Sequence, residues 1–248
     1  MDKQLICGIH PVLEALETGV ALDKVLLKKG GVGQARAQII DYCAAASIPW
    51  QEVPVEKLNR TVHARHQGVV AWKSIIQYQD PLELVTQAYE RGEQPLLVAL
   101  DRVTDVRNLG ALSRSALCFG AHGLLVPSRG TAPIQEGAIK SSAGALLHLP
   151  VCRAWNLKDS LLELQNSGLQ LVALTEKAET PLQQCPLTGP TLLLMGSEED
   201  GISPAYLELC DHKAAIPQVQ GPVGSLNVSV ATGIALYECA RQRHEQPL

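Results

Sequence analysis

Three short polar segments hold the side chains that could bind a ligand or act on one. The first contains Asn108 and Arg114, the second contains Glu198, and the third contains Ser225 and Asn227. Amides and hydroxyls can orient a polar ligand, a carboxylate can accept a hydrogen bond, and a guanidinium can bind an anion. Each segment follows an apolar run typical of a strand. Loops on neighbouring strands would therefore gather these groups at one end of a sheet, where open α/β sheets bind ligands.

Each segment also fits a purely structural role. Asn108 can cap a helix that carries Arg114 on its surface, and Ser225 can cap the last helix. Gly110 allows a ligand or another backbone to approach closely. The acidic turn 196–201 could be a solvated loop. Adjacent carboxylates in a loop rarely converge on one ion without a His or Cys, so we expect no metal site.

Several other kinds of site are excluded by their missing motifs. The run Gly31–Arg36 resembles a dinucleotide fingerprint, but Arg36 stands where close helix–strand packing needs Gly or Ala. The sequence contains no P-loop, no nucleophile-elbow motif and no zinc-protease motif.

The composition predicts a globular protein of the cytoplasm. Of the 248 residues 46% are apolar, enough for a sizeable core in one large or two small domains. No apolar run approaches the roughly 20 residues of a membrane helix, and residues 1–4 do not begin a secretory signal. Seven cysteines without a C-x-x-C pair indicate free thiols in a reducing compartment.

The charge is unevenly divided along the chain. The net charge is −4, made up of +2 in residues 1–78 and −6 in residues 79–248. The basic part contains a cluster at residues 60–66, namely Arg60, His63, Arg65 and His66. Such a cluster could contact phosphates or belong to a solvated loop, and the sequence leaves both interpretations open.

The order of apolar and amphipathic segments predicts an α/β protein. Residues 94–248 alternate between strand and helix patterns, as in a mostly parallel, doubly wound sheet. We expect strands at 96–100, 123–126, 149–153, 169–174, 191–195 and 213–216. We expect helices at 108–119, 133–146, 156–168, 204–210 and 226–243. Small residues in the last helix suit either a subunit interface or an ordinary core helix.

Two further regions precede residues 94–248. Residues 1–77 are expected to form a small α/β domain, with a helix from Pro11, strands at 24–28 and 68–72, and a helix at 34–47. Residues 78–93 are expected to link the two domains through a helix capped by Asp80.

In this order and spacing, the three segments resemble the SpoU (TrmH) family of RNA ribose 2′-O-methyltransferases. The similar motifs are Asn108-x-Gly110-x-x-x-Arg114, Leu194-Met195-Gly196-Ser197-Glu198 with Gly201, and Ile216-Pro217 followed by Ser225-Leu226-Asn227-Val228-Ser229-Val230-Ala231. The similarity extends to residues 8–16, 66–71 and 140–145, and so covers nearly the whole chain. The chain is most similar to the subgroup with a domain like ribosomal protein L30e, which methylates a guanosine ribose of 23S rRNA.

The resemblance implies a SPOUT-type fold, in which the parallel sheet of the C-terminal domain carries a trefoil knot. General connection rules favour an unknotted chain, so the knot is expected from the resemblance alone. The expected partners are S-adenosylmethionine as cofactor, large-subunit rRNA as substrate and a second copy in a homodimer. The implied cofactor-binding residues are Thr175, Met195, Gly196, Ile216 and Leu226. The implied catalytic residues are Asn108, Arg114, Glu198, Ser225 and Asn227.

Arg114 could act as a neutral base or as a cation that orients the reacting groups. Deprotonating a guanidinium at pH 7 costs roughly 8 kcal/mol, because its pKa lies far above neutral. A cation that holds the hydroxyl or a phosphate needs no such step. We therefore expect Arg114 to remain charged.

Alternatives remain within and outside this chemistry. The substrate could be a tRNA, the methylation could confer antibiotic resistance, or the chain could be a non-catalytic RNA-binding or ribosome-assembly protein. The joint presence of Asn108, Arg114, Glu198, Ser225 and Asn227 favours an enzyme.

Overall fold

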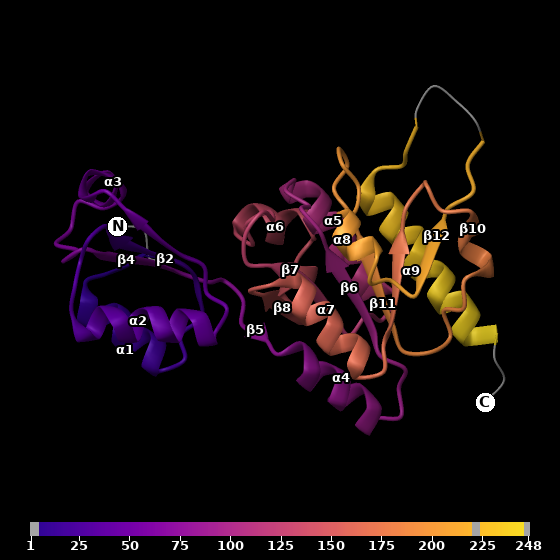
Figure 1. Cartoon of the computed structure of the whole chain (residues 1–248), viewed down its shortest axis with the longest axis horizontal. Helices are drawn as coiled ribbons and strands as arrows, with labels where there is room; N and C mark the ends of the chain where they lie inside the picture. Colours follow the sequence, from indigo (N-terminus) through magenta and orange to yellow (C-terminus); the bar gives the residue numbers. More distant parts are fainter. Residues whose placement is uncertain (1–4, 220–223, 246–248) are drawn as a thin grey trace. The chain divides into compact units, whose positions relative to one another are not determined.

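The structure is a computed structural model that describes residues 5–219 and 224–245. The chain divides into two compact units, Met1–Gln77 and Tyr78–Leu248 (Figure 1). Residues 78–93, which we expected to form a linker, contain strand β5 (Tyr78–Gln79) and helix α4 (Pro81–Glu90). Both elements belong to the second unit, because β5 pairs with its sheet and Leu84 of α4 lies in its core.

The first unit is a three-layer α/β domain. Its sheet has the order β1-β4-β2-β3, with β1 (Leu5–Cys7), β2 (Leu22–Lys28), β3 (Trp50–Val53) and β4 (Val69–Lys73). Helices α1 (Ile9–Glu17) and α2 (Gln34–Ala45) cover one face, and α3 (Val55–Thr61) covers the other. The continuous apolar run in β2 follows from this layering, because its successive side chains enter cores on opposite faces.

The second unit contains an eight-stranded sheet in which all neighbouring strands are parallel. The strand order is β10-β12-β9-β11-β6-β7-β8-β5. The remaining strands are β6 (Leu96–Leu100), β7 (Gly123–Pro127), β8 (Val151–Ala154), β9 (Gln170–Leu174), β10 (Thr180–Pro181), β11 (Thr191–Met195) and β12 (His212–Ala215). The predicted parallel α/β architecture is confirmed.

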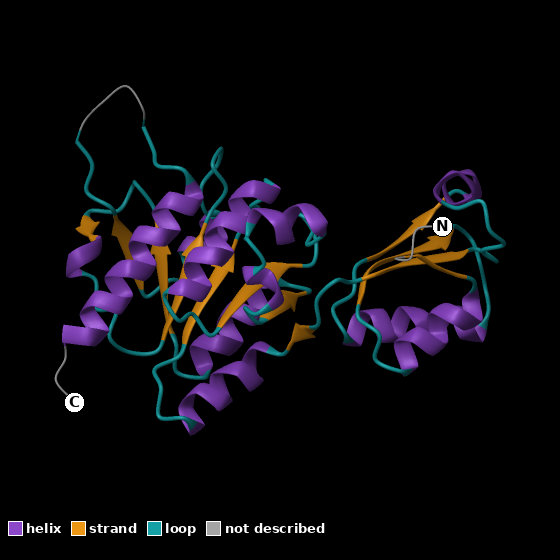
Figure 2. Cartoon of the chain, turned by 180° about the vertical axis from the view of Figure 1, so that it is seen from behind, coloured by secondary structure: helices purple, strands orange, loops and turns teal. Residues whose placement is uncertain are grey.

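Helices cover both faces of this sheet (Figure 2). Helices α4, α7 (Leu157–Asn166) and α8 (Pro204–Leu207) pack on one face around a leucine-rich core. On the other face, α5 (Val106–Cys118) packs against α6 (Glu136–Ser141) and against the long helix α9 (Val228–Glu245). Short 3₁₀ turns occupy Ala145–Leu147 and Leu182–Gln184.

The helix boundaries follow from local capping chemistry. Asp80 and Asn156 cap α4 and α7 as predicted, because their side chains accept backbone N–H groups of the first turn. The helix expected at 133–146 is shorter, since Ala143 (φ +51°) and Gly144 (φ +85°) adopt left-handed backbone after α6. The helix expected from Asn108 begins earlier, at Val106.

The C-terminal strands do not follow their chain order in the sheet. Strand β11 follows β9 in the chain but lies between β9 and β6 in the sheet, and β12 lies on the far side of β9. Part of the loop 217–225, including Pro222, lies outside the described residues. The predicted trefoil knot stays a prediction.

The seven cysteines are free thiols, as the sequence predicted. Burial raises the pKa of Cys43, Cys152 and Cys239 to about 12. These buried thiols therefore stay protonated near neutral pH and are poor nucleophiles.

Candidate functional site

The carboxyl ends of the central strands bring the three polar segments together. Asn108 lies in the first turn of α5, after β6, and Glu198 lies in the turn after β11. Asn227 immediately precedes α9, after β12. Parallel strands end at the same edge of a sheet, which explains how residues more than a hundred positions apart can meet.

Asn227 joins the three segments through its side-chain amide. Its Nδ2 donates to Asn108 Oδ1 at 3.0 Å and also donates to Glu198 Oε1. Its Oδ1 accepts the backbone N–H of Ser229 at 2.9 Å, so Asn227 caps α9. The predicted cap residue of this helix, Ser225, is replaced in that role by Asn227.

The first turn of α5 is positioned by Asp105 rather than by Asn108. Asp105 Oδ1 accepts the backbone N–H groups of Arg107 and Asn108 at 2.7 and 3.1 Å. The N–H of Asn108, aided by the Arg107 side chain, holds the pKa of Asp105 below its ordinary value. With Asp105 as the cap, the Asn108 side chain is available to Asn227.

Gly110 lies where α5 packs closely against the backbone that ends α6. A Cβ at this position would lie 2.4 Å from Ser141 Cβ and 2.8 Å from the backbone of Ser142. Of the two interpretations open at the sequence level, approach of another backbone is the one observed.

The turn after β11 is folded tightly upon itself. A Cβ on Gly196 would lie 2.2 Å from the carbonyl carbon of Gly201, so only glycine fits here. Ser197 and Gly201 exchange backbone hydrogen bonds at 3.2 and 3.1 Å, and Asp200 N donates to Ser197 Oγ. The turn thereby presents Glu198 towards Asn227.

Arg102 ties this acidic turn to the end of β6. Its guanidinium donates to Asp101 at 3.0 Å, to Asp200 at 2.9 Å and to the carbonyl of Gly201 at 3.1 Å. The buried Asp101 also accepts the N–H of Ser203 at 2.7 Å. Arg102 has φ +58°, a strained conformation for a side chain of this size. The hydrogen bonds to Asp101 raise the pKa of Arg102.

Sequence reasoning did not identify Asp101, Arg102 or Asp105 as part of the site. A signal was present, because charged residues directly after the fully apolar strand β6 are placed at the ligand-binding edge of a parallel sheet.

A cavity of about 330 Å³ lies on the β9–β12 side of the turn. Its lining includes all five predicted cofactor residues together with two of the predicted catalytic residues: Thr175, Met195, Gly196, Ile216, Leu226, Glu198 and Ser225. Its volume falls in the range of small-molecule sites. Four carboxylates and a single lysine line it, namely Glu176, Glu198, Glu199, Asp200 and Lys177. This charge balance suits a cationic ligand that also carries one anionic group.

A second cavity of about 380 Å³ adjoins the first. Asn108, Arg102 and Gly130 line it, and it shares the acidic turn and Val228 with the first cavity. Glu198, which accepts from Asn227, lines both cavities and therefore lies where two neighbouring ligands could meet.

Arg114 does not join these groups within one chain. It is exposed on α5 and lines neither of the two cavities formed by the described residues. Six residues along a helix amount to about 9 Å of rise and a rotation that leaves the side chains about 120° apart. The helical spacing therefore separates Arg114 from Asn108 within a single copy, and the role of Arg114 in the site stays a prediction.

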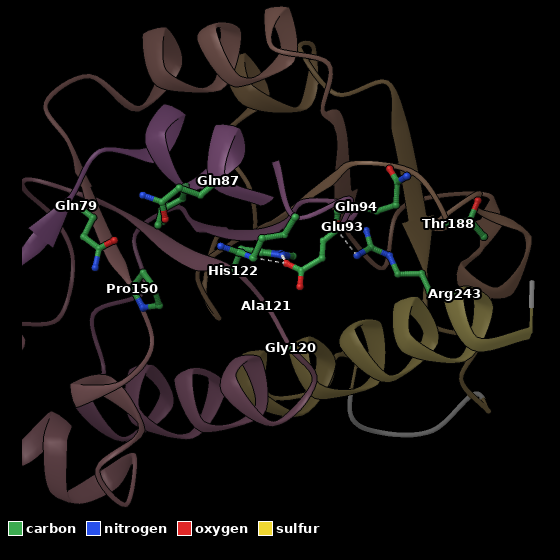
Figure 3. Close-up of a pocket in the computed structure, with 12 residues that line it drawn as sticks. Gln79, Gln87, Glu93, Gln94, Gly120, Ala121, His122, Pro150, Thr188 and Arg243 are labelled. Atoms are coloured by element: carbon green, nitrogen blue, oxygen red, sulfur yellow. Dashed lines mark hydrogen bonds and ion pairs between the residues drawn. The ribbon is translucent and has the colours of Figure 1, made fainter. Parts of the chain in front are cut away.

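A larger cavity of about 860 Å³ lies at the opposite side of the sheet, at the amino ends of the strands (Figure 3). Glu93 accepts from Arg91 Nε at 2.9 Å and pairs with His122 Nε2 at 3.0 Å. Arg243 donates to backbone carbonyls, including those of Gln94 and Gly189 at 2.8 Å. The charged groups of this cavity thus hold α9 and the strand ends in place, and this favours a structural role for the cavity.

The described residues, 5–219 and 224–245, show neither a metal-ligand cluster nor a membrane-spanning helix. In that part of the chain no three His, Cys, Asp or Glu side chains are grouped to hold a metal ion. No helix there combines the length and apolar character needed to cross a membrane.

Comparison with known proteins identifies both units. Residues 95–237 match the SpoU rRNA Methylase family, and residues 5–79 match the RNA 2′-O ribose methyltransferase substrate binding domain. An uncharacterized tRNA/rRNA methyltransferase of Mycolicibacterium vanbaalenii is 38% identical over 98% of this chain and 77% of its own length.

Solved structures agree with this match. The SpoU methyltransferase AviRb of Streptomyces viridochromogenes in complex with AdoMet is 27% identical and superimposes with a TM-score of 0.62, covering 98% of this chain and 91% of its own. The TrmH/SpoU tRNA modifying enzyme of A. aeolicus is 33% identical with a TM-score of 0.56, over 66% of this chain and 85% of its own. The shared motifs, the parallel sheet and the two matched domains show that the chain belongs to the SpoU (TrmH) family of S-adenosylmethionine-dependent RNA methyltransferases.

Proposed function

We propose that this protein methylates the ribose 2′-hydroxyl of a guanosine in large-subunit rRNA. The observation that carries the proposal is the contact of Asn227 with Asn108 and Glu198, because Glu198 lines both of the adjoining cavities and Asn108 lines the second. One cavity would hold the methyl donor and the other would admit the ribose.

The charged lining and the volume of the first cavity support S-adenosylmethionine as its ligand. Its carboxylates would favour the sulfonium and the ammonium group, and Lys177 would favour the carboxylate of the methionine portion. Gly196, Ile216 and Leu226 would border the adenosine portion through their backbones. When bound, the cofactor supplies an electrophilic methyl group.

The protein's own residues would orient the attacking hydroxyl and assist loss of its proton. Asn108 and Asn227 provide amide groups, and Glu198 provides a carboxylate acceptor beside them. Ser225 lines the first cavity, which would hold the cofactor, together with Glu198. Such alignment can supply much of the rate enhancement of a transfer reaction.

Arg114 would complete the site from a second copy of the chain. Helices α5 and α9 expose a shared apolar face that includes Val230, Ile234 and Tyr237. The ring of Phe119 packs edge-on against that of Tyr237, with 6.2 Å between the ring centroids. Burial of this face in a homodimer would place the exposed Arg114 near the partner molecule. There it would act as a cation towards a phosphate or the developing alkoxide.

The first unit would bind the RNA. The side chains of Arg60, His63 and Arg65 are exposed, and His66 Nε2 pairs with Asn59 Oδ1 at 2.7 Å. These groups can contact phosphates. Trp50 and Trp72 instead pack partly buried against the two cores of this unit.

A tRNA substrate is the second candidate within the same chemistry. The family match in residues 95–237 carries an rRNA description, and the tRNA modifying enzyme of A. aeolicus covers only two thirds of this chain. Both observations favour rRNA, and a cytoplasmic location agrees with either RNA.

Primer extension at low nucleotide concentration tests the substrate. Total rRNA and tRNA are compared from cells with the gene deleted and with the gene restored. The proposal expects one stop at a 23S guanosine that depends on the gene. A stop confined to tRNA would favour the second candidate, and no gene-dependent stop would contradict both.

A further inference from the structure

An exposed tryptophan lies at the carboxyl ends of the strands, as the candidate site does. It follows β8, which is two strands away from β6 in the sheet. Trp155 directly follows β8 and is 44% exposed. The guanidinium of Arg129, which follows β7, lies 5.4 Å from the centroid of the Trp155 ring. Strands β7 and β8 are neighbours whose last residues, Pro127 and Ala154, pair directly.

A neighbour of this pair in the chain lines the second cavity, of about 380 Å³. Gly130, the neighbour of Arg129, lines that cavity together with Asn108 and Glu198. Adjacent strands lie about 4.8 Å apart, so the end of β8 is roughly 10 Å from the end of β6. That separation is comparable to the reach of one or two nucleotides along an RNA strand.

The chemistry of the pair suits a nucleobase. An indole that is nearly half exposed leaves hydrophobic surface uncovered, and base–aromatic stacking is tolerant of sequence. Arg129 holds the ring by a cation–π contact and brings a positive charge to the place where a phosphate would follow the base.

We propose that Trp155 and Arg129 form a subsite for an unpaired nucleotide next to the methylated one. Trp155 stacks on the base and Arg129 contacts the adjoining phosphate. The subsite rests on the proposed function in assuming an RNA substrate, and it adds a single-stranded segment beside the target. RNA is commonly recognised through such splayed bases.

The test compares Trp155→Ala and Trp155→Phe with the native protein. RNA affinity is measured by anisotropy with a labelled 12-nucleotide single-stranded RNA and with an unmodified 23S rRNA transcript. We expect Trp155→Ala to weaken binding by roughly 5- to 100-fold, and Trp155→Phe to restore most of it. Arg129→Gln should make the slope of log affinity against log salt concentration shallower by the amount expected for about one lost phosphate contact.

Tyr89→Ala is the matched control. Tyr89 is 42% exposed on α4, and its hydroxyl donates to the carbonyl of Ser167, which precedes β9 at the opposite edge. Its loss should leave RNA affinity unchanged. Quenching of tryptophan fluorescence by the 12-nucleotide RNA should be weaker in Trp155→Phe than in the native protein.

The outcomes separate the subsite from the catalytic assignment. Calorimetry with S-adenosylmethionine should give the same affinity for the native protein and for Trp155→Ala. Native-like RNA affinity in Trp155→Ala, or absence of RNA binding by the native protein, would overturn the subsite. Failure of the native protein to bind S-adenosylmethionine would overturn the proposed function whatever the RNA results.

Discussion

Asn227 combines a structural and a functional role that substitution can separate. Its Oδ1 caps α9, while its Nδ2 binds Asn108 and Glu198. Asn227→Asp should keep the cap, because aspartate caps helices as well as asparagine does, but it places a second carboxylate beside Glu198. We expect a native-like thermal midpoint and a loss of kcat of about 100-fold or more. Asn227→Ala, as the comparison, should lose activity and about 1 kcal/mol of stability.

The role proposed for Arg114 depends either on its planar guanidinium or on its positive charge alone. If the planar guanidinium must hold two atoms at once, Arg114→Lys should retain little activity, and if charge alone suffices it should retain a substantial part. Arg114→Ala should be nearly inactive at every pH tested, because alanine supplies no cation for the phosphate or the developing alkoxide. Steady-state rates across a pH series provide the measurement, and an Arg114→Ala enzyme of native rate would remove this residue from the mechanism.

At the scale of elements, the acidic turn after β11 depends on Arg102. Arg102 holds Asp200 and the carbonyl of Gly201, and the turn lines both cavities. Arg102→Ala should release the turn and leave the buried Asp101 without its cation, so we expect about tenfold weaker S-adenosylmethionine binding, or ~1.4 kcal/mol. Calorimetry measures this change.

The control is Arg107→Ala, which removes an exposed guanidinium paired with Asp105. It should leave cofactor affinity unchanged. Equal affinity in the Arg102→Ala protein would show that the turn holds its shape without that residue.

The elements were predictable where local chemistry decides them. The strand-like runs 96–100 and 191–195 match β6 and β11 residue for residue, because continuous apolar runs have few other places to lie. The start of α5 was missed because Asp105 caps it from outside the motif. The separation of Arg114 from Asn108 is a consequence of helical rotation, and the strain at Arg102 depends on a tertiary contact that sequence spacing does not encode.

At the scale of the whole molecule, a homodimer would supply the missing guanidinium. Mixing Arg114→Ala with Asn227→Asp protein after partial unfolding should form heterodimers with one intact site, provided that each site draws Arg114 from its partner. We expect recovery of up to about a quarter of native activity, because half of the randomly paired molecules are heterodimers with one of two sites active. Activity that never recovers would assign Arg114 to its own chain's site.

The apolar face on α5 and α9 should carry that dimer. Ile234→Glu places a charge in the centre of the exposed cluster of Val230, Ile234 and Tyr237, and burial of an unpaired charge is costly. Light scattering after size exclusion should then report a monomer, whereas Leu147→Glu, at an exposed position on the 3₁₀ turn after α6, should remain dimeric.

The most direct measurement follows the methyl group itself. The native protein is incubated with S-adenosylmethionine labelled in its methyl group and an unmodified 23S rRNA transcript, and the RNA is digested to nucleosides for chromatography and mass spectrometry. The account predicts label in 2′-O-methylguanosine, absent when the Asn227→Asp protein is used. Label on a base, or a cofactor that binds without any transfer to the ribose, would contradict it.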